Sequence, residues 1–407
     1  MNLLRKILIP FGIFVILIQS SLHAVYVDED TAYVWSESTV QTAATGEEKK
    51  DFLDLSCESA ILIEQTTGTV LYEKDSHAKL RPASVTKIMT ILLIMEAIDN
   101  GQISYDTKIT ASENAASMGG SQIWLEVGES LTVNEMLKAI CIVSANDCCV
   151  AMSEHLAGSE AAFVDKMNEK AKALGMNDTT FKNCHGIDED DHFTTAYDIA
   201  LMSKELLNKY PEVTKYTSTW MDSLRGGQSE LVNTNKLIRT YDGATGLKTG
   251  STSLALYNLS ASATRDNLSL IAVVMRAPSP TERVSNARKL LDYGFSNFEF
   301  VSHSTKGKTV KKVTVEKGIE KEVELVYEKD SGTILKRGAA SNIESKMSVN
   351  EKISAQIKKG DVLGKVEFYL DGKKVGTSNL VANSSIDKIG TLSNFKHIIH
   401  NWWCLFR

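Results

Sequence analysis

The hydrophobic and polar positions divide this chain into stretches of different periodicity. Residues 7–18 form an unbroken apolar run, whereas residues 25–51 are polar and carry no periodic signal. From about residue 52 to 296, apolar segments of strand length and of helix length follow one another. From 300 to 382, short stretches largely alternate apolar with polar residues, which is typical of strands with one buried face. The pattern predicts a mixed domain over 52–296, a linker over 25–51 and a small β domain over 300–382.

Strands are expected at both ends of the mixed domain. Residues 59–63 and 70–72 favour a hairpin that turns at Thr67-Gly68, and residues 256–263 and 268–275 favour a second strand pair. Helical segments lie between them. This order indicates an α+β fold, in which an antiparallel sheet carries helices on its faces.

Two of the expected helices have clear boundaries. The first spans 84–99, with Pro82 just before it and Gly101 as its C-terminal stop. It is apolar on nearly every side, so we expect it to run through the middle of the domain. The second begins at Thr132, whose spacing to Glu135 matches a capping box.

The N-terminus has the layout of a secretory signal peptide. Arg5 and Lys6 precede the apolar run, and small and polar residues follow it up to Ala24. The run of 12 residues is shorter than the roughly 20 that a spanning helix needs. We therefore predict a signal peptide over 1–24, with an uncleaved anchor as the alternative, and a folded part outside the cytoplasm.

The C-terminal tail, residues 385–407, has a helical stripe. Its apolar residues recur at steps of three and four, while lysines, histidines and asparagines fill the other side, and two tryptophans lie near the end. A basic amphipathic helix of this kind is expected to lie in the membrane interface rather than to cross it. The alternative is a helix docked on the β domain.

Composition narrows the function classes. The formal net charge is −6 and the pI is near 5.8, so a nucleic-acid partner has no electrostatic support. Six cysteines are present, but no Cys-x-x-Cys pair, so a zinc knuckle and a thioredoxin-like motif are excluded. Cys148 and Cys149 are adjacent, and a chain with a large core does not need disulfides. We expect mostly buried free thiols, with at most one disulfide in the mixed domain.

Three short motifs carry the candidate chemistry: Ser84-Val85-Thr86-Lys87, Ser144-Ala145-Asn146 and Lys248-Thr249-Gly250. Each one alone is a weak signal. The first pattern also occurs at 76–79 and 385–388, and the second also occurs at 112–114. We expect Ser76 and Lys79 to lie on the surface, because the stretch around them is polar.

Ser84 and Lys87 have the spacing of a nucleophile and its base. Three residues apart on a helix, they share one face, and Ser84 lies in the first turn, where free N–H groups favour negative charge. Ile88 and Met89 follow Lys87, so its amine is expected to be desolvated and available in the neutral form. The alternative is that Ser84 and Lys87 are an ordinary solvent-facing pair on a helix. In a segment this apolar, however, the lysine would be buried without a functional reason, and its burial is costly unless it is paired.

The other two motifs are less specific. Ser144 and Asn146 lie at a helix junction, where polar side chains are usually caps. Lys248-Thr249-Gly250 is expected to precede a strand. A glycine there lets a substrate backbone approach a strand edge, while Lys248 and Thr249 offer a cation and a hydroxyl to a carboxylate.

Together the three motifs resemble the active-site set of penicillin-recognising serine enzymes. Further stretches, Arg81-Pro82-Ala83-Ser84, Asn183 to Gly186, Thr194 to Asp198 and Asn233 to Leu237, are similar to low-molecular-mass D-alanyl-D-alanine carboxypeptidases, particularly those of spore-forming bacteria. The resemblance covers residues 52–296. It implies a penicillin-binding/β-lactamase-like catalytic domain, followed by a small all-β domain and an amphipathic C-terminal helix.

The resemblance also implies a role for each matching residue. Ser84 would be the nucleophile, Lys87 its activator, and the backbone N–H groups of Ser84 and Ser251 the oxyanion hole. Three further residues would shuttle protons and hold the peptide: Ser144, Asn146 and Lys248. The terminal carboxylate and the substrate backbone would meet Thr249, Gly250, Ser251 and Arg283, although Arg283 also fits a plain helix start. No cofactor and no metal are expected.

The implied substrate is a peptidoglycan stem peptide ending in D-Ala-D-Ala, with β-lactams as covalent inhibitors. The implied location is the extracytoplasmic face of the cell membrane. Two departures from the family pattern are Ala145, where glycine is more frequent, and Thr245, where aspartate is usual. The alternatives are a serine β-lactamase, which would need a Glu-x-x-Leu-Asn element that 188–191 lacks, and a catalytically weak peptidoglycan-binding module.

Overall fold

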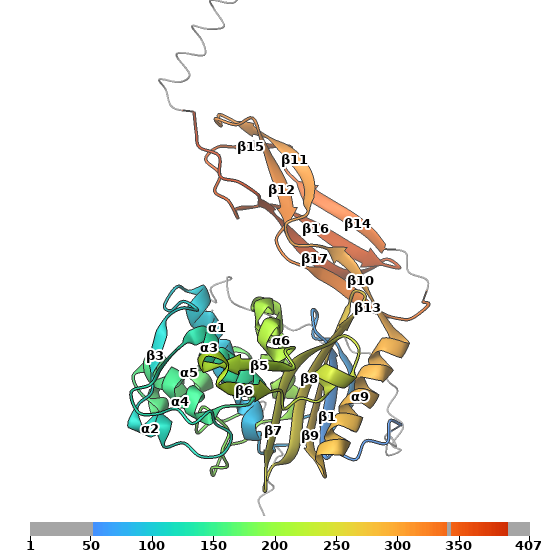
Figure 1. Ribbon diagram of the computed structural model, residues 1–407. Helices are drawn as coiled ribbons and strands as arrows, with labels where there is room; N and C mark the ends of the chain where they lie inside the picture. The colour runs from blue at the N-terminus through green and yellow to red at the C-terminus, as the bar shows by residue number, and fades with distance from the viewer. Residues whose placement is uncertain (1–51, 340–342, 390–407) are drawn as a thin grey trace, which may run out of the picture. The chain divides into compact units, whose positions relative to one another are not determined.

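The computed structural model describes residues 52–339 and 343–389. The predicted signal peptide and linker therefore lie outside the described residues, and so does most of the predicted C-terminal helix. Within the described residues the chain forms a mixed domain and a β domain (Figure 1).

A five-stranded antiparallel sheet forms the centre of the mixed domain, in the order β2-β1-β9-β8-β7 (Figure 1). Its strands are β1 (Ser59–Glu64), β2 (Val70–Lys74), β7 (Ala244–Thr252), β8 (Leu256–Arg265) and β9 (Leu268–Ala277). The predicted pairs β1/β2 and β8/β9 are confirmed. The sheet also joins the two ends of the domain, since β1 pairs with β9. β7 occupies an edge.

The two faces of the sheet are buried in separate cores because side chains alternate along each strand. Ile61 and Ile63 face the larger core, whereas Ala60 and Leu62 face the smaller one. The larger core is shared with the helices between β2 and β7. The smaller core is closed by a single long helix, α9 (Pro280–Asn297), which covers the opposite face in Figure 1.

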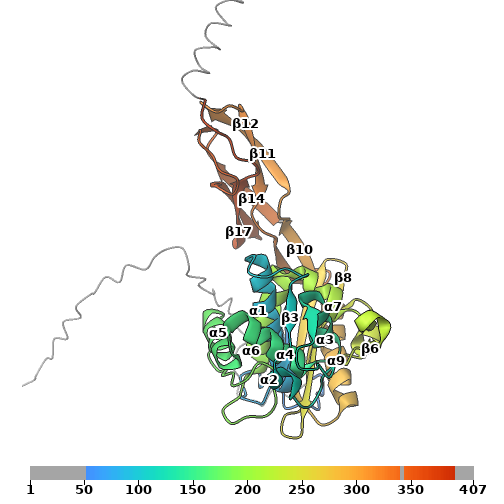
Figure 2. The same cartoon turned by 60° about the vertical axis from the view of Figure 1, so that its left-hand side comes forward.

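Helices cover the larger-core face of the sheet, and two of the three candidate motifs lie at helix ends there (Figures 1 and 2). The longer ones are α1 (Lys87–Asp99), α3 (Val133–Ile142), α4 (Asn146–Ala157), α5 (Glu160–Ala173) and α6 (Ala196–Lys209). The predicted capping box between Thr132 and Glu135 is confirmed. The predicted helix over 84–99 is also confirmed and buried, but its first turn is the 3₁₀ helix η1 (Ala83–Thr86).

Shorter elements complete the mixed domain. They are α2 (Glu113–Ala116), α7 (Thr214–Thr217), α8 (Leu237–Thr240), η2 (Pro211–Val213), η3 (Arg225–Gly227) and the small strand pairs β3 (Lys108–Thr110) with β4 (Ser130–Thr132) and β5 (Met221–Leu224) with β6 (Ser229–Val232).

The β domain contains a two-stranded and a six-stranded sheet, the second in the order β14-β16-β17-β12-β11-β15. The strands are β10 (Phe298–Ser304), β11 (Thr309–Glu316), β12 (Glu322–Tyr327), β13 (Ser331–Lys336), β14 (Ile343–Val349), β15 (Lys352–Ser354), β16 (Val362–Leu370) and β17 (Lys373–Ala382). The predicted hairpin turn at Asp371-Gly372 is confirmed, with positive φ at both residues. Its core includes Val313, Leu325 and Phe368.

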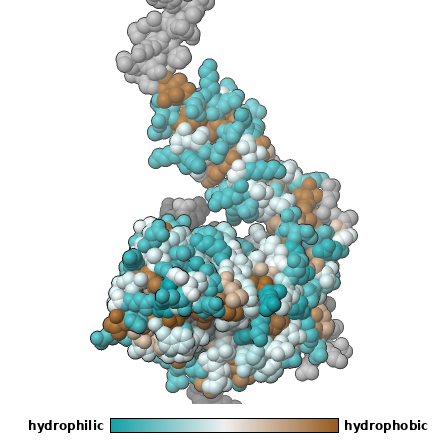
Figure 3. All heavy atoms as spheres, viewed as in Figure 1, coloured by the Kyte–Doolittle hydropathy of each residue, from teal (hydrophilic) through white to brown (hydrophobic). Residues whose placement is uncertain are grey.

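The face shown in Figure 3 is mostly hydrophilic, with small separate hydrophobic patches. Over residues 52–339 and 343–389 no helix has the length and hydropathy that a membrane span requires. The predicted α+β class, with a separate all-β domain, is confirmed.

Candidate active site

Ser84 and Lys87 lie where the sequence predicted, at the start of the buried central helix. Lys87 Nζ lies 3.1 Å from Ser84 Oγ. Ser84 is partly exposed, whereas the Lys87 side chain is completely buried. The serine hydroxyl is thus open to a ligand, while the amine beside it is shielded from water.

Lys87 has two further partners from distant parts of the chain. Its Nζ donates to Asn146 Oδ1 at 2.6 Å and to the main-chain oxygen of His185 at 2.6 Å. Burial lowers the pKa of Lys87 from its ordinary value, against smaller opposing effects from Cys149, Cys184 and Asp147. The neutral amine, a base able to accept the serine proton, is therefore more accessible than in a lysine exposed to water.

Ser144 and Asn146 join this pair from the junction of α3 and α4. Neither caps α4, whose N-cap is Ala145 without a side-chain hydrogen bond, so the capping interpretation is wrong. Asn146 reaches Lys87 instead. Ser144 has φ +67° and a buried hydroxyl that no group in the described residues pairs with. A strained residue with a free buried hydroxyl beside a nucleophile is typical of a functional position.

The departure at Ala145 has little conformational effect. Ala145 has φ −59°, which any residue can adopt, and the left-handed conformation of this motif lies at Ser144 instead. A glycine at position 145 is therefore not needed for this backbone. At the other departure, Thr245 Oγ1 lies 2.8 Å from Ser262 Oγ on the neighbouring strand.

The third motif lies inside strand β7 rather than before a strand, which corrects the prediction. Lys248 is buried, and its Nζ donates to the main-chain oxygen of Thr249 at 2.9 Å. Burial, and after it the charge of Lys87, lowers the pKa of Lys248 to about 7. Thr249 Oγ1 shares a 2.7 Å hydrogen bond with Thr234 Oγ1.

Gly250 allows β7 to pass directly over the first turn of the central helix. A Cβ at this position would lie 2.8 Å from the nitrogen of Val85 and 2.9 Å from that of Ser84. The next residue, Ser251, is exposed on the free edge of the sheet. An edge strand presents unpaired N–H and C=O groups, so this edge can accept an extended peptide.

Arg283 lies at the N-terminal end of α9. It contacts β7 and β8, because its Nη1 donates to the main-chain oxygens of Gly250 and Asn258, both at 3.3 Å. Its Nε has no partner among the described residues. Burial lowers the pKa of Arg283 to about 10, so the guanidinium stays charged near neutral pH. The structure therefore brings Arg283 to the carbonyl side of the motif glycine.

Two positioning groups were not identified as such from the sequence. His185 contributes a main-chain oxygen to Lys87, and a carbonyl has no side-chain signature in a sequence. Asn258, on β8, donates through Nδ2 to the oxygens of Arg81 and Pro82 at 2.8 and 3.0 Å. Asn258 therefore holds the segment that leads into Ser84 against the sheet.

His185 and His192 both form hydrogen bonds within the fold. His192 Nε2 lies 2.9 Å from Thr86 Oγ1, and His185 Nδ1 accepts from the Ile187 N–H at 3.2 Å. Burial lowers the pKa of His185 to about 3 and that of His192 to about 4, so both rings are neutral. Across residues 52–339 and 343–389 no group of three or more metal-ligating side chains has a suitable arrangement. His397 and His400 lie outside the described residues.

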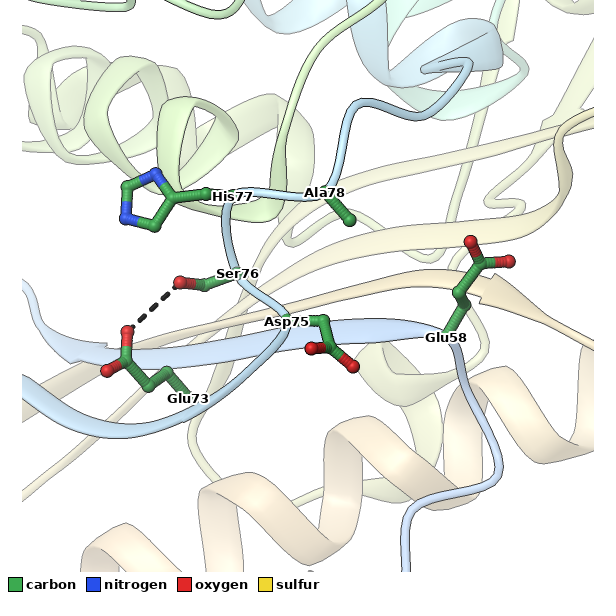
Figure 4. A pocket seen from close by; sticks show the side chains of 6 residues that line it. All are labelled: Glu58, Glu73, Asp75, Ser76, His77 and Ala78. Atoms are coloured by element: carbon green, nitrogen blue, oxygen red, sulfur yellow. Dashed lines mark hydrogen bonds between the residues drawn. The ribbon is translucent and has the colours of Figure 1, made fainter. Parts of the chain in front are cut away.

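The second occurrence of the Ser-x-x-Lys pattern has a different environment. Ser76 is buried, which corrects the prediction that it lies on the surface, whereas Lys79 is exposed and pairs with Asp178 at 3.0 Å. Ser76 Oγ donates to Glu73 at 3.0 Å at the wall of an acidic pocket, which contains none of the three motifs (Figure 4). At the third occurrence, Ser385 is exposed and not helical.

The five cysteines that the structure describes are free and buried, as expected: Cys57, Cys141, Cys148, Cys149 and Cys184. Cys404 lies outside the described residues. Burial raises the pKa of Cys141 and of Cys149 to about 12, so the thiols are protonated and unreactive near neutral pH.

Comparison with known proteins covers nearly the whole described chain. A family model described as D-alanyl-D-alanine carboxypeptidase, peptidase S11, matches residues 39–279, and a model for the C-terminal domain of penicillin-binding protein 5 matches residues 298–388. The chain is 47% identical over 348 residues to D-alanyl-D-alanine carboxypeptidase DacF of Bacillus subtilis, covering 84% of this chain and 89% of the relative. The predicted similarity to members of spore-forming bacteria is confirmed.

Solved structures agree with the fold. Penicillin-binding protein 5 of Haemophilus influenzae is 29% identical, with a TM-score of 0.65 over 85% of this chain and 100% of that structure. Penicillin-binding protein D2 of Listeria monocytogenes in its ampicillin-bound form is 32% identical, with a TM-score of 0.55 over 60% of this chain and 99% of that structure. Geometry and similarity lead to one conclusion: the chain belongs to the D-alanyl-D-alanine carboxypeptidase family of serine peptidases.

Proposed function

We propose that this chain removes the terminal D-alanine from peptidoglycan stem peptides through an acyl-enzyme on Ser84. The observation that supports this most is the buried Lys87 amine, 3.1 Å from a partly exposed serine hydroxyl and with a lowered pKa. Both properties are those of an activated nucleophile.

Acylation begins with attack of Ser84 Oγ on the carbonyl carbon between the two D-alanines. The hydroxyl proton passes to Lys87 Nζ, and the oxyanion is held by the backbone N–H groups of Ser84 and Ser251. The C–N bond then breaks, and the leaving amine takes up a proton through the free hydroxyl of Ser144. Water hydrolyses the resulting ester by the same route, which releases the shortened peptide and restores Ser84.

Substrate binding uses the free edge of β7. An extended peptide can pair with the edge strand, and Gly250 lets this strand lie directly against the first turn of the central helix, beside Ser84. The terminal carboxylate meets Lys248 and Thr249, and Arg283 adds positive charge from behind the strand. A β-lactam presents a carbonyl and a carboxylate in the same way, so it acylates the same serine.

The decisive experiment compares three alanine variants in D-alanine release and in labelling by penicillin. Ser84→Ala and Lys87→Ala should lose both reactions. In another serine hydrolase the loss of the nucleophile costs on the order of 10⁶ in turnover, so no activity should be detectable. Ser76→Ala, which removes a buried hydroxyl outside the motif cluster, should behave like the parent.

The same material identifies the labelled residue. Digestion of penicillin-labelled parent protein and mass spectrometry should place the adduct on Ser84. An adduct on Ser76, on Ser385 or on a cysteine would overturn the proposed mechanism. Rapid turnover of penicillin would indicate a β-lactamase, and labelling without D-alanine release would indicate a peptidoglycan-binding module.

The proposal includes a location at the extracytoplasmic face of the membrane. The support is the order of basic, apolar and small residues over 1–24 and the amphipathic pattern toward the C-terminus. The substrate supports it too, because stem peptides belong to the cell wall.

A further inference from the structure

Asp147 is a completely buried carboxylate at the first turn of α4, directly after Asn146. Its Oδ2 accepts from the backbone N–H groups of Ile123 at 3.0 Å and Leu125 at 3.1 Å. Its Oδ1 accepts from the N–H of Cys148 at 2.9 Å. Burying a charge costs several kcal/mol unless hydrogen bonds compensate for it, and here two of the three bonds go to a separate loop.

That loop, residues 119–125, is also what holds Asn146. Asn146 donates through its side-chain Nδ2 to the oxygen of Gly119 and through its backbone N–H to the oxygen of Ser121, both at 2.7 Å. Because Nδ2 is engaged there, the amide oxygen must face Lys87, to which it is bound at 2.6 Å. The orientation of Asn146 toward the base is therefore set by the loop.

Arg225, in η3, holds the same loop from outside. Its Nη1 donates to the oxygen of Ile123 at 3.0 Å, while its Nε and Nη2 bind the carboxylate of Glu129 at 2.7 and 2.9 Å. Trp124 lies between Ile123 and Leu125, the two residues that hydrogen-bond to Asp147. It has φ +54° and is 74% exposed. Such a backbone persists only where its surroundings hold it, and Asp147 and Arg225 supply that restraint.

We infer that Asp147 is a positioning residue for the reaction: it fixes the 119–125 loop, which orients Asn146 toward Lys87 and so keeps the base aligned with Ser84. This inference rests on the proposed roles of those residues. Asp147 itself does not touch the nucleophile. It affects the rate through Asn146, so the losses in rate caused by replacing Asp147 and Asn146 should not be additive.

The test is a double-mutant cycle between Asp147→Asn and Asn146→Ala, with the rate constant of acylation by benzylpenicillin as the readout. Asp147→Asn should slow acylation roughly 10- to 100-fold, since small misplacements at an active site cost up to about 10². In the Asn146→Ala background the same change should cost almost nothing further. Two residues that act independently would give additive losses instead.

Two measurements separate positioning from loss of folding. Amide hydrogen exchange of the 119–125 peptide should increase in Asp147→Asn while the central helix stays protected. Asp198→Asn is the matched control, because Asp198 is also buried and accepts hydrogen bonds from the N–H of Asp178 and the hydroxyl of Thr179 at another turn. It should lower stability and leave acylation per folded molecule unchanged.

A milder variant keeps the inference testable if Asp147→Asn does not fold. Arg225→Gln weakens the outer anchor at a partly exposed side chain. It should give a smaller loss of acylation that also disappears in the Asn146→Ala background. Parent-like acylation in both variants, or additive losses, would overturn the inference. A parent protein that is not acylated at all would instead contradict the proposed function.

Discussion

At the scale of single residues, two buried lysines distinguish this site from an ordinary core. Lys87 and Lys248 are completely or almost completely buried, and burial is the largest cause of the lowered pKa in both. Burial of an ionisable amine is unfavourable for folding. The site therefore costs stability, as active sites often do. This cost is measurable because it depends on pH.

Lys248→Met should stabilise the protein most at pH 7 and below. Since the pKa of Lys248 falls from 10.5 to about 7 on folding, the unfolded chain binds more protons between these values, and the cost of burial fades as pH rises through them. One pKa unit corresponds to about 1.4 kcal/mol, so the gain is on the order of several kcal/mol. Urea unfolding of parent and variant across this range measures it.

Lys79→Met is the control for this titration. Lys79 is exposed and paired with Asp178 at the surface, so its replacement should change the free energy of unfolding little. A stabilisation by Lys248→Met that stayed constant up to pH 10.5 would contradict the assigned cause.

Ser144→Ala should lower the activity of the protein without lowering its stability. The Ser144 hydroxyl is buried and has no partner in the described residues, so its removal leaves no broken bond behind. Alanine keeps the Cβ, so the strain of φ +67° is unchanged. Thermal unfolding should stay at the parent temperature or rise, while D-alanine release falls by about 10²- to 10⁴-fold. A large loss of stability would assign Ser144 a structural role instead.

At the scale of elements, the site depends on the approach of strand β7 to the first turn of the central helix. Ser84 and Ser251, the two proposed oxyanion donors, belong to these two elements. Gly250 permits the approach because it has no Cβ, and Asn258 ties the segment before Ser84 to β8.

Gly250→Ala should therefore slow acylation strongly without unfolding the protein. The new methyl group would lie within 3 Å of backbone atoms of Pro82, Ser84 and Val85, so β7 must move away from the helix. Acylation should fall by roughly 10² or more, as expected for the loss of an oxyanion donor, with the circular dichroism spectrum retained.

Gly158→Ala is the matched control for this change. Gly158 ends α4 with φ +82°, and the position that a Cβ would occupy there is open. Alanine there should cost about 1 kcal/mol of stability and leave acylation per folded molecule unchanged. Parent-like acylation in Gly250→Ala would show that the contact at Gly250 does not position the site.

At the scale of the whole molecule, the β domain extends past the predicted end at residue 382 and includes the first residues of the predicted amphipathic segment, 385–407. Ile386 lies in the core of the β domain and pairs with Ile357, so the described domain continues close to residue 389. The mixed domain and the β domain carry net charges of opposite sign. Residues 52–299 carry 22 Lys and Arg against 32 Asp and Glu, whereas residues 300–388 carry 17 against 12.

Deletion of residues 390–407 should release the processed protein from membranes and leave D-alanine release unchanged. The deletion begins after Ile389 because an earlier cut would remove Ile386 from the β-domain core. Fractionation of cells and an activity assay on the released protein measure both outcomes. A truncated protein still bound to membranes with its signal peptide removed would refute the anchor.

Local sequence was sufficient for the elements with strong periodicity. The β1/β2 and β8/β9 hairpins, the buried helix over 84–99 and the capping box at Thr132 were all predicted, because each depends on residues that are neighbours along the chain. Strand β7 was missed. Its central residues are Lys248, Thr249 and Gly250, which lack the apolar alternation of a strand.

The sequence by itself determined which residue types could carry the chemistry and the family to which the chain belongs. Only the tertiary structure decided what those residues do. Lys87 meets Asn146 from 59 positions away and His185 from 98 positions away. The same packing buries Ser76 and leaves the Ser144 hydroxyl without a partner in the described residues. It also brings Asp147 within hydrogen-bonding distance of the 119–125 loop. Periodicity reports local conformation, whereas burial and hydrogen bonding of a polar group depend on segments far apart in the chain.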